Sequence, residues 1–275
     1  MMKFTASYLH TFILIVCCSC LASSVALANE LGITPPRERS TGCGIARTGT
    51  GNFTTVKIPI LDQDRIYHLR VPSTYDPKRA YPLIFRWHGT GGNGLSGGLD
   101  IELSSGNDAI IVGADGLNKS WYGNSTASDL LLFDRMLDTI EKQYCIDRGR
   151  IFSYGFSAGG YFSNLLACER GDVLRASAAI ASGPRGTHCK GQVAHWLLHD
   201  ADDRAVPIAK GKAARDRAIS MNNCSAASIN EGDGCTLYQG CTEAPVIWCE
   251  SKGFGHNIRN EFATPRVWNF FLNLR

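Results

Sequence analysis

Short apolar runs alternate with segments of helical periodicity along most of this chain, and this alternation restricts the fold more than any other feature. The runs lie at residues 82–87, 109–114, 150–154, 176–181, 193–199 and 246–250. Several are apolar at consecutive positions, as expected of strands covered on both faces. The clearest helical segment is 128–144, and others start at Ala158, Pro207 and Pro265. The sequence therefore predicts an α/β fold with a mostly parallel central sheet and helices on both faces.

The pattern before the first of these runs is different. Apolar and β-branched residues alternate with polar ones over 53–60 and 65–71, on either side of the polar residues 62–64. This predicts an antiparallel hairpin at one edge of the sheet. No repeat or linker interrupts residues 43–275, where we expect a single domain, and residues 29–42 read as a loose N-terminal arm.

The first 28 residues have the features of a secretory signal peptide. Lys3 gives a basic start, residues 12–22 are largely apolar, and Ala26-Leu27-Ala28 forms a small-x-small cleavage site. A membrane anchor is the alternative, but the run is shorter than the roughly 20 apolar residues of a span. A lipid-anchored Cys20 is a second alternative. We expect a secreted protein with no membrane attachment, periplasmic if the host is bacterial.

Removal of that segment leaves 11 − 3 = 8 cysteines. An even number of cysteines in an exported chain predicts disulfides, but eight cysteines allow about 105 pairings, so the connectivity stays open. Five of them fall between Cys189 and Cys249 and are expected to cross-link that region locally. The eight are Cys43, Cys145, Cys168, Cys189, Cys224, Cys235, Cys241 and Cys249.

Charge and ligand spacing exclude two classes of partner. The formal charge is +3, from 28 basic and 25 acidic residues, and the basic residues are scattered rather than clustered. This is not the pattern of a nucleic-acid-binding protein. The chain beyond residue 28 has no Cys-x-x-Cys pair, and its cysteines are expected to form disulfides, so we predict no metal and no cofactor.

Gly-x-Ser-x-Gly, the pattern of a serine nucleophile at a sharp turn, occurs at 94–98 and at 155–159. Such a nucleophile needs a buried strand directly before it and a helix directly after it. Ser157 has both, whereas Ser96 lies inside a Gly-rich loop. We therefore predict Ser157 as the nucleophile.

The oxyanion of an acyl-transfer reaction requires two N–H donors. We predict that the first donor is the amide of Ala158, at the start of the helix after the nucleophile. The Gly-rich segment 88–92 follows the strand at 82–87, and we predict the amide of Thr90 as the second. His88 is interpreted as a residue that orders this loop by hydrogen bonding.

The base and its acid are expected after the nucleophile, in the order Asp or Glu and then His. Asp203 is favoured as the acid because it lies just before the Val-Pro step that begins the next helix; Asp202 remains an alternative. His256, in a Gly-rich loop after the last strand, is the predicted base. The other histidines of the mature chain, His68, His188, His195 and His199, are interpreted as structural.

Together these motifs resemble secreted feruloyl esterases of carbohydrate esterase family 1, whose relatives include acetyl xylan esterases and polyhydroxybutyrate depolymerase-like enzymes. The resemblance covers roughly residues 40–275. It is carried by His88-Gly-Thr-Gly-Gly92, Asp115-Gly116 followed by Trp121, Tyr144-Cys-Ile-Asp147, Gly155-Phe-Ser-Ala-Gly-Gly160 and Gly255-His256.

That resemblance implies an α/β-hydrolase with Trp121 near the substrate, and Tyr122 beside it offers a second ring for stacking on a cinnamoyl group or a sugar. Members commonly have Gly where this chain has Asp200, which adds a negative charge next to the predicted acid.

The expected function is hydrolysis of carboxylic esters on feruloylated plant cell-wall polysaccharide, by a monomer that binds no nucleic acid. Acetyl xylan esterase and polyester hydrolase activities are alternatives within the same class, with acetylated polysaccharide or small esters as substrates. A non-catalytic carbohydrate-binding protein of esterase ancestry is an alternative from another class, and a secreted peptidase is a third.

Overall fold

A computed structural model of the chain describes residues 38–274, except 97–98, 122–125 and 242. The predicted signal peptide at 1–28 and most of the predicted arm at 29–42 lie outside these residues, as does Tyr122. Among the described helices, none has both the length and the apolar character that a membrane span needs.

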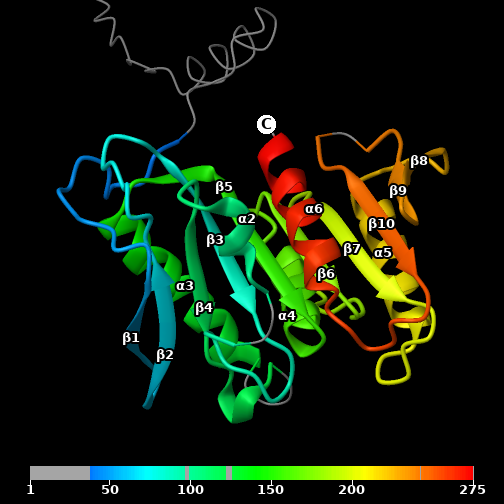
Figure 1. Ribbon diagram of the computed structural model, residues 1–275, viewed down its shortest axis with the longest axis horizontal. Helices are drawn as coiled ribbons and strands as arrows, with labels where there is room; N and C mark the ends of the chain where they lie inside the picture. The colour runs from blue at the N-terminus through cyan, green and yellow to red at the C-terminus, as the bar shows by residue number, and fades with distance from the viewer. Residues whose placement is uncertain (1–37, 97–98, 122–125, 242, 275) are drawn as a thin grey trace, which may run out of the picture. The chain divides into compact units, whose positions relative to one another are not determined.

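One sheet of ten strands forms the centre of the described structure (Figure 1). Its order is β1-β2-β4-β3-β5-β6-β7-β10-β9-β8, and the six strands from β4 to β10 in this order run parallel. The predicted mostly parallel sheet is therefore confirmed. The strands are β1 (Phe53–Ile60), β2 (Gln63–Arg70), β3 (Tyr81–Trp87), β4 (Ile110–Ala114), β5 (Ile146–Phe156), β6 (Ala176–Ile180), β7 (Ala194–Asp200), β8 (Ser228–Gly232), β9 (Cys235–Tyr238) and β10 (Val246–Ser251).

Antiparallel hairpins close both edges of the sheet. The predicted N-terminal hairpin is β1–β2, which pairs from Phe53 with Arg70 to Ile60 with Gln63. The second hairpin, β8–β9, was not expected because every residue of β8 is exposed and the strand has no buried alternation to reveal it. Its turn at Asp233-Gly234 is the one sequence signal that indicates it.

Helices cover both faces of the sheet, as predicted. Buried side chains of α3 and α4 pack with one set of strand residues, such as Phe85 and Ile151, while those of α2 and α6 pack with the alternate set, such as Ile84 and Phe152. The helices are α2 (Ile101–Ser105), α3 (Thr126–Gln143), α4 (Ala158–Glu169), α5 (Ile208–Met221) and α6 (Asn260–Asn273), with a short 3-10 helix at Leu117–Lys119. Helix α6 begins at Asn260, so the predicted start at Pro265 is wrong, and that proline lies within the helix.

Disulfides pair all eight cysteines of the described chain, as expected from their even number. The bonds are Cys43–Cys145, Cys168–Cys189, Cys224–Cys241 and Cys235–Cys249. In three of them, one cysteine lies near the C-terminal end of a helix: Cys145 follows α3, Cys168 lies in the last turn of α4, and Cys224 follows α5. Because these helices run antiparallel to the strands they follow, these three disulfides lie at the edge of the sheet where the parallel strands begin.

The end of the predicted loose arm is bound to the domain. Ser40 Oγ donates to the Tyr144 carbonyl at 2.6 Å and accepts from the Ile146 amide at 2.8 Å. The Cys43–Cys145 disulfide adds a covalent link at the same place. From residue 38 onward the expectation of a loose segment is therefore wrong, because hydrogen bonds fix the chain against the start of β5.

Candidate active site

Ser157 occupies the sharp turn between β5 and α4. Its φ of 53° and ψ of −119° are unusual for a residue with a side chain, and its amide donates to the Ile180 carbonyl at 2.9 Å. The turn is possible because its neighbours are glycines: a Cβ on Gly155 would lie 2.1 Å from the Gly159 carbonyl oxygen, and one on Gly159 would lie 1.9 Å from that of Trp87. The strand and the helix on which the prediction depended are both present.

His256 lies between Ser157 and Asp203. Its Nε2 is 2.9 Å from Ser157 Oγ, and its Nδ1 is 2.7 Å from Asp203 Oδ2. A carboxylate can only accept, so Nδ1 carries the proton and Nε2 is free to accept the Ser157 proton. The structure thus brings the three predicted residues into one hydrogen-bonded chain, although they come from loops after β5, β7 and β10.

Asp203 is held as a carboxylate. Its side chain is fully buried, and its Oδ1 accepts from the Ala205 and Val206 amides, both at 2.9 Å. Burial by itself raises the pKa of this carboxyl, but the Val206 amide, His256 and the Ala205 amide together outweigh burial and lower it. The rival acid Asp202 makes a different contact: its Oδ2 accepts from the Gly253 amide at 3.0 Å.

The segment 88–92 passes next to Ser157 and forms a tight turn. The Gly92 amide donates to the Gly89 carbonyl at 3.1 Å, and Gly91 has a φ of 90°, as the third residue of a type II turn requires. Thr90 is the second residue of the turn, a position whose amide the turn leaves unused. A Cβ on Gly89 would lie 3.5 Å from Ser157 Cβ, so this turn approaches the nucleophile closely.

Ala158 is the first residue of α4, where a helix leaves its amides without internal acceptors. Its N–H and that of Thr90 are thus the two donors that the sequence singled out, and neither is used by the element that contains it. Preorganised donors of this kind can stabilise negative charge that develops on an ester oxygen.

His88 orders the segment 88–92 and makes hydrogen bonds through both ring nitrogens. Its Nε2 accepts from the Gly116 amide at 3.0 Å, so Nδ1 carries the proton and donates to the Gly89 carbonyl at 2.7 Å. Burial lowers the pKa of this imidazole, more than the Gly89 carbonyl and Asp115 raise it. A neutral histidine with both nitrogens bonded has no site left for proton transfer.

Trp121 lies under this loop. Its ring is fully buried and stacks on Phe162 at a centroid distance of 4.9 Å, with Trp87 against it edge-on at 5.1 Å. Its Nε1 donates to the His88 carbonyl at 3.0 Å. The expected stacking of a substrate ring on Trp121 therefore has no exposed ring face to use. The side chain supports the loop from within the core.

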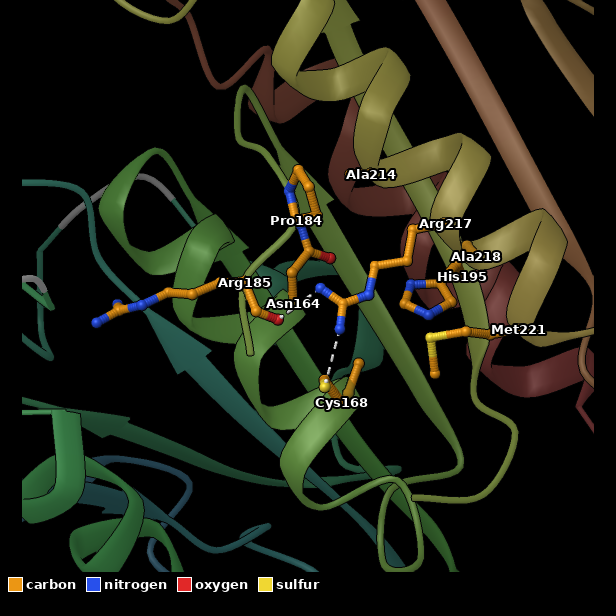
Figure 2. Close-up of a pocket in the computed structure, with 10 residues that line it drawn as sticks. Asn164, Cys168, Pro184, Arg185, His195, Ala214, Arg217, Ala218 and Met221 are labelled. Carbon is orange, nitrogen blue, oxygen red and sulfur yellow. Dashed lines mark hydrogen bonds between the residues drawn. The ribbon is translucent and has the colours of Figure 1, made fainter. Parts of the chain in front are cut away.

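Two further histidines are buried in β7. His199 Nε2 donates to the Val206 carbonyl at 2.8 Å, which places it behind the Asp203 loop. His195 is 7% exposed, and its Nδ1 has no hydrogen-bond partner within the described residues. Figure 2 shows His195 in a small pocket beside Arg217, whose guanidinium donates to the sulfur of Cys168. Neither histidine contacts Ser157.

Sequence reasoning missed the role of Asp200, which it noted only as an added charge. The residue ends β7 and is buried at 4% exposure among backbone amides. The departure from Gly at this position was the available signal.

Within the described residues, no group of three His, Cys, Asp or Glu side chains is arranged to hold a metal ion.

Comparisons with known proteins show similarity to feruloyl esterases. No protein-family model matches the sequence. It is 34% identical to feruloyl esterase D of Neurospora crassa over 263 residues, which cover 84% of this chain and 89% of that protein. It is 30% identical to a probable feruloyl esterase C of Aspergillus terreus over 91% of this chain and 97% of that protein.

Solved structures share the fold at lower identity. A ferulic acid esterase from Anaeromyces mucronatus, determined in complex with ferulic acid, matches with a TM-score of 0.56 and 18% identity over 84% of this chain and 94% of its own. An acetyl xylan esterase from Aspergillus awamori matches with a TM-score of 0.62 and 11% identity over 80% and 99%. Given the sequence identity along most of its length, the chain belongs to the feruloyl esterase family of carboxylic ester hydrolases.

Proposed function

We propose that this protein is a secreted serine esterase that releases ferulate or a related hydroxycinnamate from esters on plant cell-wall polysaccharide. The observation that carries the proposal is the hydrogen-bonded chain from Asp203 through His256 to Ser157 at a strained strand-to-helix turn. The choice of ferulate as the acyl group follows from the name of the family. The four disulfides support export, because such bonds persist in oxidising compartments.

The reaction begins when Ser157 Oγ attacks the ester carbonyl carbon and His256 Nε2 takes the hydroxyl proton. Asp203 stabilises the imidazolium that forms, and its own lowered pKa keeps it ionised. The carbonyl oxygen becomes an oxyanion, for which the Ala158 and Thr90 amides are the proposed donors. His256 then gives its proton to the departing sugar oxygen, which leaves the feruloyl group on Ser157.

Water completes the cycle. His256 Nε2 takes a proton from a water molecule, the resulting hydroxide adds to the acyl carbon, and the same two amides again stabilise the oxyanion. Collapse of this intermediate breaks the bond to Ser157, whose oxygen recovers a proton from His256. The product is a free hydroxycinnamate. Apart from this water molecule and the ester, each step uses only side chains and amides of this chain.

The second Gly-x-Ser-x-Gly provides a matched control for the test. We expect Ser157→Ala to lower kcat on methyl ferulate at least about 10⁴-fold, because the nucleophile is lost. Ser96→Ala should keep kcat within about twofold of the wild type, since Ser96 lies in an exposed loop. Activity that survives Ser157→Ala would contradict the mechanism.

Substrate choice is tested separately from mechanism. The kcat/KM of the wild type should be higher on methyl ferulate than on acetylated xylan, and polyhydroxybutyrate film should be a poor substrate. A preference for acetylated xylan that disappears in Ser157→Ala would keep the mechanism and replace the proposed acyl group. Polysaccharide binding without ester hydrolysis or labelling of Ser157 by a fluorophosphonate would instead indicate a binding protein.

A further inference from the structure

A second buried carboxylate, that of Asp200, contacts the loop that carries His256. Asp200 ends β7 and lies opposite Ser251, the last residue of β10. Its Oδ2 accepts hydrogen bonds from Ser251 Oγ at 2.9 Å and from the Phe254 amide at 3.1 Å. Its Oδ1 accepts one from the Gly255 amide at 3.0 Å. These three donors belong to the segment that leads from β10 to His256.

The same carboxylate contacts the loop that carries the acid. Asp200 Oδ1 also accepts from the Asp202 amide at 2.9 Å, which fixes the turn that leads directly to Asp203. Asp202 adds one more bond between the loops, because its Oδ2 accepts from the Gly253 amide at 3.0 Å. The two loops meet only through folding, because more than 50 residues separate Asp203 from His256.

Besides Asp200, the His256 loop is held by the bond from the Gly253 amide to Asp202 and by the Arg259 guanidinium, which lies 3.8 Å from the centroid of the Phe254 ring. Gly253 and Gly255 have φ values of 89° and 62°, a conformation that glycine adopts readily but does not by itself enforce. Phe254 between them is 53% exposed and therefore contributes little burial. Hydrogen bonds to its backbone are what define this segment, and Asp200 accepts two of them.

Asp200 is suited to this task because it accepts at every position. Burial by itself raises the pKa of its carboxyl, but the hydrogen bonds from the Asp202 amide, Ser251 and the Phe254 and Gly255 amides outweigh burial and lower it. An asparagine of the same shape would turn an NH₂ group toward at least one backbone N–H, from which it could not accept a hydrogen bond.

We propose that Asp200 is a positioning residue for the reaction: by binding the backbones of both loops, it sets the distance and angle at which His256 meets Asp203 and Ser157. This inference rests on the proposed function. The carboxylate of Asp200 holds the two loops together and does not transfer a proton, since among the described contacts it bonds to neither His256 nor Ser157.

The test compares Asp200→Asn with Glu250→Gln. Glu250 pairs with Lys212 at 3.3 Å on the surface, so its variant removes one nearby negative charge without affecting either loop. Kcat on methyl ferulate is counted per Ser157 that a fluorophosphonate labels at completion, which removes misfolded molecules from the comparison. We expect this corrected kcat to fall roughly 10- to 100-fold in Asp200→Asn, with KM within about twofold, and to stay within about twofold in Glu250→Gln.

A purely structural role gives a different result. It would lower the fraction of molecules that can be labelled and leave the corrected kcat unchanged, and that outcome would overturn the proposal. If Asp200→Asn does not fold, Ser251→Ala removes one donor to the carboxylate and keeps the charge. The corrected kcat should then fall roughly 2- to 10-fold, as expected for one hydrogen bond, and no change would overturn the proposal.

The rate of labelling separates this inference from the proposed substrate. If the wild type reacts with the fluorophosphonate but does not hydrolyse methyl ferulate, the substrate assignment is wrong. Asp200 is then still tested, because positioning requires the labelling rate of Ser157 to fall at least about tenfold in Asp200→Asn. An unchanged labelling rate would overturn the inference whatever the substrate.

Discussion

The buried imidazole of His195 predicts that the protein loses stability when the pH falls from 7 to 5. Burial, and secondarily the positive charge of Arg217, lower the pKa of His195 from 6.5 to about 4. The unfolded chain has neither influence and keeps the ordinary value. Between pH 6.5 and pH 4 the unfolded chain therefore binds a proton that the folded chain does not, and the free energy of unfolding decreases as the pH falls.

The size of the effect follows from the two pKa values. Their difference, at about 1.36 kcal/mol for each pH unit, corresponds to a maximum of about 3.4 kcal/mol. About 2 kcal/mol of this is already lost at pH 5, where the unfolded imidazole is almost fully protonated and the folded one is not. That is a large part of the stability of an ordinary domain.

His195→Phe removes the titration and keeps a planar ring of similar size. Guanidinium unfolding with the disulfides intact gives the free energy of unfolding at pH 7 and at pH 5. We expect the loss between these pH values to be about 2 kcal/mol smaller in His195→Phe than in the wild type. His188→Gln, at a side chain that is 87% exposed, is the control and should behave as the wild type does. Equal losses in wild type and His195→Phe would refute the reasoning.

Two other predictions concern the acid and the longest cross-link. Asp203→Asn should lower kcat on methyl ferulate roughly 10³- to 10⁴-fold, because Nδ1 of His256 loses its acceptor, whereas Asp202→Asn should cost at most about tenfold; steady-state kinetics with the reverse order would reassign the acid. Replacing Cys43 and Cys145 by serine should lower the free energy of unfolding by about 4 to 5 kcal/mol, because the bond joins residues 102 apart in the sequence. An unchanged midpoint in guanidinium would contradict this prediction.

Local sequence patterns predicted the parallel sheet and the placement of Ser157 well. Strands buried on both faces have continuous apolar runs, and a nucleophile at a sharp turn needs small residues at fixed positions, so both leave a signal within a few residues. The hairpin β8–β9 left almost none, because an exposed strand needs no apolar alternation.

The acid could not be chosen from the sequence with the same certainty. Asp200, Asp202 and Asp203 are near neighbours, and only the approach of a loop more than 50 residues away determines which carboxylate faces His256. Trp121 failed for a related reason. The resemblance implied a ring near the substrate, but it could not indicate that Phe162 and Trp87 cover that ring.

Three disulfides lie where the parallel strands begin, and the catalytic candidates lie where those strands end. This separation has a consequence for how such an enzyme can change. Covalent reinforcement at the edge where the strands begin does not depend on the loops where they end. Substitutions in the loops around Ser157 and His256 can therefore accumulate with little effect on the disulfide-linked end of the domain. We expect directed evolution toward new esters to succeed by varying those loops, while heat tolerance is improved separately at the other edge.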